Sequence, residues 1–179
     1  MVKTLYVNLF GAPGAGKSTT AAGTFAQLKL MGINAELVTE YAKDIVWEGS
    51  FSKLENQLYV FGKQYQRLFR VAGKVDVVVT DSPILLSTIY DNTEGDELKN
   101  LVLATHNKMD TVNFFLNRVK KYNPAGRMQT EEESDLISLK IKKMLEDNGI
   151  EYHELDGDES AMKTIATYIS VVLSRRMIS

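Results

Sequence analysis

The residues best suited to chemistry form one short glycine-rich segment near the N-terminus. Residues 11–18 read Gly-Ala-Pro-Gly-Ala-Gly-Lys-Ser and fit the pattern G-x-x-x-x-G-K-[ST] at every fixed position. Glycines let a backbone turn tightly and bring its N–H groups close to an anion, and a following helix directs its positive end to the same place. The segment therefore predicts a nucleotide site, with Lys17 on the β- and γ-phosphates and Ser18 as a ligand of Mg²⁺. The expected nucleotide-binding residues are Gly11, Ala12, Pro13, Gly14, Ala15, Gly16, Lys17, Ser18 and Thr19.

This loop has to be positioned by a strand before it and a helix after it, and such elements alternate along the whole chain. Short apolar or β-branched runs predict strands at 4–10, 33–39, 75–80, 111–116 and 150–155. Helices are expected at 18–31, 40–47, 54–71, 97–108, 131–148 and 158–176. The alternation predicts an α/β fold in three layers, a five-stranded parallel sheet with helices on both faces. Such sheets bind ligands at the carboxyl ends of their strands.

Composition narrows the class of protein. The chain has 179 residues, of which 44% are hydrophobic, and a net charge of −2, which is typical of one globular domain, here 1–179. There is no overall basic excess of the kind that duplex-binding proteins usually carry. Cysteine is absent, which excludes disulfides and thiolate metal sites. No apolar run approaches the ~20 residues of a membrane helix, so we expect a cytoplasmic protein with no membrane partner.

Four segments together resemble a known group of enzymes. They are residues 11–19, residues 39–44 (Thr-Glu-Tyr-Ala-Lys-Asp), residues 80–83 (Thr-Asp-Ser-Pro) and the basic run 118–127. In these the chain resembles P-loop kinases of nucleosides and nucleotides. It is similar to the nicotinamide riboside kinase-like group and to phage kinases proposed to phosphorylate 5-hydroxymethyl-deoxyuridine in DNA. The resemblance implies a P-loop fold, ATP and Mg²⁺ as cofactors, a nucleoside-like or nucleotide acceptor that could be modified DNA, and the host cytoplasm if the chain is phage-encoded.

Carboxylates follow the second and third predicted strands. Asp81 stands where phosphoryl-transfer proteins place a Mg²⁺-linked carboxylate or a catalytic base, although an Asp before Ser-Pro could equally cap a helix. Glu40 and Asp44, four residues apart, would share one face of a short helix and could bind an acceptor hydroxyl and accept its proton. A solvated helix end explains both equally well. Glu40 is preferred because it is nearer the strand, and Trp47 is a candidate for stacking on the acceptor.

The resemblance also assigns roles to two later segments. It makes residues 117–130 a lid that closes over the phosphates, with Arg127 stabilising the transferring phosphoryl group and Arg118 stacking on adenine or contacting phosphate. The alternative is a solvated basic turn paired with the glutamates at 131–133, for which we expect only a helix-capping role. In the turn after the last strand, the resemblance implies that Gly157 contacts adenine through its backbone, although Asp-Gly is also a common turn pair.

The sequence thus predicts an ATP-dependent phosphotransferase that moves the γ-phosphoryl group to a nucleoside-like or nucleotide acceptor. The alternative is a nucleotide-dependent regulatory ATPase switch that acts on a protein partner. Residues 107–110 (Asn-Lys-Met-Asp) fit the guanine-reading pattern N-K-x-D, but they end a predicted helix and precede a strand, which is the wrong context. The sequence leaves open the acceptor, whether it is free or within DNA, the preference for ATP or GTP, the oligomeric state, and which of Glu40, Asp44 and Asp81 is the base.

Overall fold

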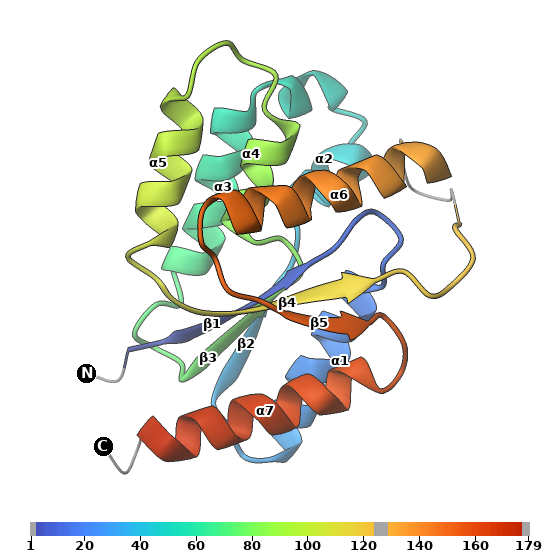
Figure 1. Ribbon diagram of the computed structural model, residues 1–179. Coiled ribbons are helices and arrows are strands. Elements are labelled where there is room, and N and C mark those ends of the chain that lie inside the picture. The colour runs from blue at the N-terminus through green and yellow to red at the C-terminus, as the bar shows by residue number, and fades with distance from the viewer. Residues whose placement is uncertain (1–2, 124–128, 177–179) are drawn as a thin grey trace.

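The first strand lies in the centre of a five-stranded parallel sheet (Figure 1). All six of its residues are buried because it pairs on both sides, with β3 and with β4. The order across the sheet is β2-β3-β1-β4-β5. The strands are β1 (Leu5–Phe10), β2 (Ala35–Val38), β3 (Val77–Thr80), β4 (Asp110–Asn117) and β5 (His153–Asp156). The computed structural model describes residues 3–123 and 129–176.

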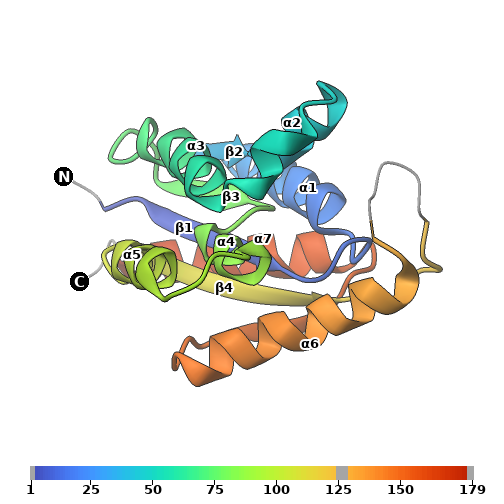
Figure 2. The same ribbon diagram turned by 90° about the horizontal axis from the view of Figure 1, so that it is seen from above.

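Helices cover both faces of this sheet. Leu5, Val7 and Leu9 of β1 point to one face, where they pack under α1 and α7, while Tyr6 and Phe10 point to the other, as the two-residue period of a strand requires. Figure 2 shows α3 on the β2 and β3 side and α6 along β4. The helices are α1 (Lys17–Leu30), α2 (Tyr41–Trp47), α3 (Gln57–Phe69), α4 (Ser87–Tyr90), α5 (Glu97–His106), α6 (Glu131–Asp147) and α7 (Ala161–Arg176). The predicted three-layer α/β fold is confirmed, and a single domain over 1–179 stays a prediction.

The helix expected at 54–71 is wrong at its start. Residues Phe51–Glu55 form a separate 3₁₀ helix, and α3 begins after Asn56, whose side chain accepts a hydrogen bond from the Tyr59 N–H at 3.0 Å. This capping contact stabilises a new helix start, and Leu58, in the first turn of α3, is 58% exposed. The sequence pattern predicts no helix at 84–90, yet these residues form a short 3₁₀ helix (Ile84–Leu86) and α4.

The start of α6 agrees with expectation. The Thr130 side chain accepts from the Glu133 N–H, and the Glu133 carboxylate accepts from the Thr130 N–H at 2.7 Å. This reciprocal capping box fixes the first turn of the helix. Within the parts of the chain that the structure describes, no helix is long and apolar enough to cross a membrane.

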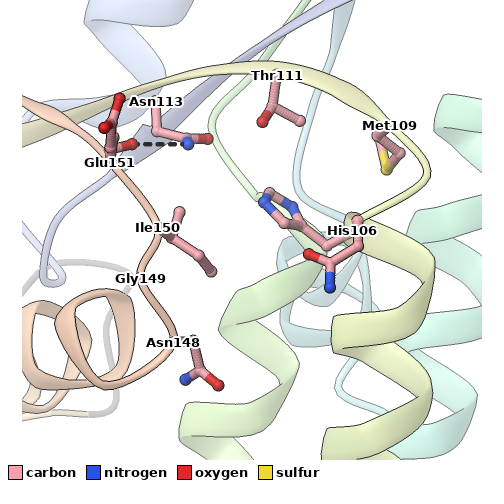
Figure 3. Close-up of a pocket in the computed structure, with 9 residues that line it drawn as sticks. His106, Met109, Thr111, Asn113, Asn148, Gly149, Ile150 and Glu151 are labelled. Carbon is pink, nitrogen blue, oxygen red and sulfur yellow. Dashed lines mark hydrogen bonds between the residues drawn. The ribbon is translucent and has the colours of Figure 1, made fainter.

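An open cavity of about 350 Å³ lies at the amino ends of β4 and β5, opposite the glycine-rich loop (Figure 3). It is lined by the ends of α5 and α6, among them His106 and Asn148, and by Thr111, Asn113 and Glu151. His106 is 5% exposed, and its Nδ1 has no hydrogen-bond partner among the described residues. Burial lowers the pKa of this imidazole, because the charged form is poorly solvated there.

The lowered pKa of His106 predicts acid sensitivity. The unfolded chain binds this proton more readily than the folded chain, so the free energy of unfolding should fall once the pH drops below about 6.5, the usual histidine value. One proton contributes at most about 1.4 kcal/mol per pH unit. Urea unfolding at several pH values between about 5 and 8 measures the slope. His106→Phe should flatten it and His153→Gln, at the exposed second histidine, should not; an unchanged slope in His106→Phe would contradict the assignment.

Candidate active site

The glycine-rich loop connects β1 to α1 at the carboxyl edge of the sheet. Helix α1 begins at Lys17, directly after Gly16, whose φ of 92° lies in the left-handed region that glycine adopts most readily. No acidic side chain occupies the first turn of α1, so its positive end is not neutralised. Ser18 and Thr19 are exposed there. The Lys17 Nζ donates to Gly11 O at 2.7 Å and lies 3.3 Å from Ala12 O, which places the ammonium group along the loop.

The turn after β5 packs directly on this loop. The Gly157 N–H donates to Asn117 O at 2.8 Å. A Cβ on Gly157 would stand 2.1 Å from Ala15 O, and one on Gly16 would stand 3.2 Å from Gly157 O. Gly157 was expected to contact adenine through its backbone. The structure places its backbone against the loop that would carry the phosphates, and the adenine contact itself stays a prediction.

Glu40 and Asp81 reach the same edge of the sheet from neighbouring strands. In the register of the sheet, Val38 pairs with Thr80, and Thr80 pairs with Asn8 of β1. Because the three strands are parallel, the residues that follow them come together at one edge. Glu40 follows β2 by two residues and Asp81 follows β3 directly, so both lie beside the loop that follows β1.

The pKa of Glu40 reflects the closeness of Lys17 and Asp81. Burial raises its pKa, the Lys17 charge opposes the rise, and the Asp81 charge adds to it. Tyr90, at the end of α4, belongs to the same cluster, because burial and the charge of Glu40 raise its pKa to about 12. Tyr90 therefore remains a neutral hydroxyl at physiological pH. Tyr90 ends α4, one of two short helices that the sequence pattern does not predict, so nothing in the sequence marked this residue as part of the site.

Asp81 does not cap a helix, although its position before Ser-Pro in the sequence allowed that role. The following 3₁₀ helix has Pro83 at its N-cap and no side-chain cap. Asp81 is 3% exposed, and its Oδ1 has no hydrogen-bond partner among the described residues. Buried carboxylate oxygens are normally paired. A carboxylate after β3 and a serine hydroxyl, that of Ser18 after the neighbouring strand β1, are the kinds of oxygen ligand that Mg²⁺ prefers. No group of three or more histidine or acidic side chains in the described chain could hold a metal alone, so phosphate or water oxygens would complete the set.

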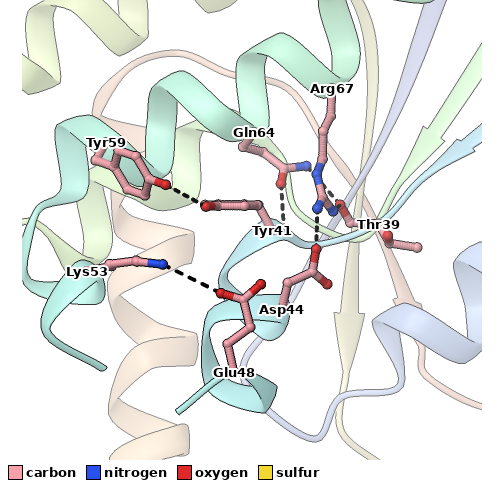
Figure 4. A network of polar contacts seen from close by, with 8 residues as sticks. All are labelled: Thr39, Tyr41, Asp44, Glu48, Lys53, Tyr59, Gln64 and Arg67. Atoms are coloured by element: carbon pink, nitrogen blue, oxygen red, sulfur yellow. Dashed lines mark hydrogen bonds and ion pairs between the residues drawn. The ribbon is translucent and has the colours of Figure 1, made fainter. Parts of the chain in front are cut away.

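A second network joins the end of β2 and α2 to α3 and fixes where α2 begins (Figure 4). The Gln64 side chain accepts from the Tyr41 N–H at 2.9 Å, and Arg67 of α3 donates to Thr39 O at 3.3 Å while pairing with Asp44. These contacts hold the backbone at the end of β2, so that α2 starts at Tyr41 and Glu40 stays extended at its N-cap.

One expectation for this region is corrected. Glu40 precedes α2, so it and Asp44 do not share one helical face; Asp44 is bound by Arg67 and ties α2 to α3. Trp47 is the last residue of α2 and is 75% exposed. The pKa of Glu40 responds to the charges of Lys17, Asp81 and Asp44, and the acceptor roles of Asp44 and Trp47 stay predictions.

The basic segment after β4 is only partly described. Arg127 lies outside the described residues, and the lid over 117–130 stays a prediction. Arg118 is not solvated: its guanidinium pairs with Glu131 and Asp135 of α6 and lies over the Tyr122 ring. The sequence alternative, in which the basic residues pair with the glutamates at 131–133, is therefore present between Arg118 and Glu131. This ion pair lies beside the glycine-rich loop. Asp135 and Tyr122 were not predicted, since neither stands in a recognisable pattern.

The fold and the glycine-rich loop at this edge of the sheet define a P-loop protein. A family model described as an AAA domain matches residues 6–161, and the chain belongs to that family. A solved structure of deoxyadenosine kinase from M. mycoides with bound dATP matches with a TM-score of 0.60 at 18% sequence identity, covering 92% of this chain and 99% of that chain. No curated protein sequence matches the chain. The structural likeness confirms the fold.

The raised pKa of Glu40 predicts that this side chain lowers stability at neutral pH. A folded-state pKa above the unfolded value means that stability is greatest at acid pH and declines as Glu40 ionises. Glu40→Gln keeps the shape and removes the half-buried charge, so its Tm should exceed that of the parent at pH 7.5, each kcal/mol corresponding to about 2–4 °C. Thermal unfolding at pH 5 and 7.5 measures the difference, with Glu36→Gln in β2 as the control. A Glu40→Gln protein that melts lower at both pH values would refute the assignment.

The close approach at Gly157 predicts a severe effect of one methyl group. Gly157→Ala would push against the Ala15 carbonyl, and overpacking of this kind costs about 1–3 kcal/mol. We expect the free energy of unfolding to fall by that amount and ATP binding to weaken, because the phosphate loop must shift. Urea unfolding and titration with a fluorescent ATP analogue measure both. Gly62→Ala in α3, where a Cβ meets open space and φ is not positive, controls for the loss of a glycine, and equal ATP affinity in the two variants would count against the contact.

Proposed function

We propose that the protein is an ATP- and Mg²⁺-dependent phosphotransferase that acts on a hydroxyl group of a nucleoside-like acceptor. The observation that carries the proposal is the meeting of Glu40, Asp81 and Lys17 at the carboxyl edge of the sheet, where burial and Asp81 raise the pKa of Glu40. A phosphate loop alone supports nucleotide binding. A half-buried carboxylate whose pKa is raised above the usual glutamate value, beside that loop, adds a group that accepts a proton more readily than an exposed glutamate.

The donor side follows from the loop. Its N–H groups and the positive end of α1 bind the phosphates, and Lys17 leaves the carbonyls of Gly11 and Ala12 to neutralise the β- and γ-phosphates. Ser18 and Asp81 would hold Mg²⁺, which neutralises charge on the phosphates when it is bound. Arg118 and the proposed lid would add positive charge that neutralises the remaining negative charge of the nucleotide phosphates.

On the acceptor side, Glu40 would bind the attacking hydroxyl. As the hydroxyl oxygen forms its bond to the γ-phosphorus, the bond to the β–γ bridging oxygen breaks, ADP leaves with that electron pair, and the hydroxyl proton passes to the Glu40 carboxylate. Tyr90, neutral and close to Glu40, can donate a hydrogen bond to the acceptor or to Glu40 itself. The likeness to deoxyadenosine kinase supports a nucleoside-like acceptor; a modified base within DNA would have to leave the helix to reach this edge.

A regulatory ATPase is the second candidate function, because the matching family model is described as an AAA domain. In that case the γ-phosphoryl group would pass to water, and the same Glu40 could orient that water. The two candidates differ only in which hydroxyl reaches the base, so the product distinguishes them.

Transfer of labelled phosphate tests the proposal. Protein, Mg²⁺ and ATP labelled at the γ-phosphate are offered nucleosides, nucleoside monophosphates, nicotinamide riboside, and DNA with or without 5-hydroxymethyl-deoxyuridine. We expect label in one acceptor. Lys17→Ala should reduce transfer by about 10²–10³-fold. Glu40→Gln should reduce it by about 10²–10⁴-fold while it still binds ATP, and Glu36→Gln should transfer normally.

The distribution of label decides between the candidates. Label that appears only as free phosphate, at the same rate with every acceptor, would overturn the phosphotransferase and support the ATPase. Normal transfer by Glu40→Gln would exclude Glu40 as the base and return that role to Asp81.

A further inference from the structure

The first turn of α6 is attached directly to the P-loop. The Ser134 Oγ donates to Pro13 O at 2.8 Å, and Ser134 is completely buried. The capping box at Thr130 and Glu133 fixes the helix start at the same point. Figure 2 shows the loop after β1 next to this end of α6. Side chains on the first turn of α6 are therefore held at a fixed distance from the glycine-rich loop.

Two of those side chains bind Arg118. Its Nη2 lies 2.5 Å from Asp135 Oδ1, and its Nη1 lies 3.1 Å from Glu131 Oε1. The arginine side chain is only 14% exposed, and its guanidinium carbon lies 5.2 Å from the centroid of the Tyr122 ring. Two carboxylates and one aromatic face thus restrict a side chain that would otherwise sample many rotamers.

The restricted arginine lies against the P-loop. A Cβ on Gly14 would be 3.2 Å from the Tyr122 ring and 3.8 Å from the Arg118 Cδ. The contact between Nη1 and Glu131 has the distance of an ion pair, but Nη1 is buried and makes no hydrogen bond to any described residue. A buried guanidinium donor without a hydrogen bond is costly, and here it stands beside the loop that binds phosphates.

We propose that Glu131 and Asp135 are positioning residues, which hold Arg118 across Tyr122 so that the guanidinium serves the nucleotide bound at the P-loop. The inference rests on the proposed function to the extent that ATP is the nucleotide bound there. It gives the acidic first turn of α6 a role beyond helix capping. Through Ser134 and these two carboxylates, one helical turn fixes both the loop and the arginine.

The proposal predicts whether ATP affinity rises or falls when the two carboxylates are neutralised. Two negative charges near a phosphate site repel ATP, so charge alone predicts that the double variant Glu131→Gln/Asp135→Asn binds ATP more tightly. Loss of positioning predicts the opposite, because Arg118 would have to be ordered anew during binding. We expect ATP affinity to fall by about three- to tenfold, the usual cost of immobilising one long side chain.

Direct binding of ATP, without acceptor, is the measurement. A fluorescent ATP analogue with Mg²⁺ is titrated into the parent, the double variant and the matched control Glu132→Gln. Glu132 stands in the same turn, but it interacts with Thr130, so it controls for charge and for the helix dipole. The single variants Glu131→Gln and Asp135→Asn, each with a smaller loss, keep the test decisive if the double variant folds poorly.

A mutant cycle shows whether the carboxylates act through the arginine. Arg118→Ala should weaken ATP binding, and adding the double substitution to Arg118→Ala should weaken it no further. A merely structural role of the two carboxylates would reduce ATP affinity in both backgrounds.

Three results would overturn the proposal. They are ATP binding by the double variant as tight as in Glu132→Gln, an undiminished effect of the double substitution in the Arg118→Ala background, and unchanged ATP binding by Arg118→Ala itself. Failure to phosphorylate any acceptor would overturn the proposed function alone, because binding of ATP is measured without it.

Discussion

The contact between two backbones, at Gly157 and at Ala15, constrains the carboxyl edge of the sheet on which the candidate site depends. There is no space for a side-chain atom between the turn after β5 and the glycine-rich loop. The loop is therefore fixed from one side by the turn before α7 and from the other by Ser134 of α6. Elements from the last third of the chain thus set the shape of a loop near its beginning. A phosphate site made of backbone N–H groups needs this support, because its selectivity depends on the positions of those groups.

The same edge carries an electrostatic cost that the rest of the structure must offset. Asp81 is buried and Glu40 is half-buried, and burial and the charge of Asp81 raise the pKa of Glu40 while the charges of Lys17 and Lys43 oppose that rise. Two apolar clusters, one on each face of the sheet, hold the strands that bring these carboxylates together. Arg67 adds to this by binding the Asp44 carboxylate and the Thr39 carbonyl. Placing like charges close together in a poorly solvated site lowers stability, and functional sites commonly accept this loss because the shifted pKa values serve the chemistry.

The parts that could be predicted from the sequence are those with local causes. The glycine pattern, the buried run of β1, the valine strand β3 and the capping box of α6 depend on neighbouring residues only. What could not be predicted depends on partners distant in sequence. Arg67 decides the orientation of Asp44, and the contacts of α3 with Tyr41 and Thr39 hold Glu40 outside the helix. Asn56 divides an apparently continuous helical pattern. The gathering of Tyr90 with Glu40, and of Arg118 with Asp135, follows only from the folded arrangement.

The strand order has a consequence for how the chain is made. In the described sheet, β1 pairs only with β3 and β4, and β2 pairs only with β3. Leu5 meets its first partner at Val77, so during synthesis no two strands can pair until β3 has left the ribosome. Until then the most apolar strand of the protein has to be shielded by helices or chaperones. The glycine-rich loop, which contacts Ser134 and Gly157, has both of these supports only after the chain has been made as far as Gly157. A nascent chain shorter than this therefore carries the glycine pattern without the contacts that hold it in shape.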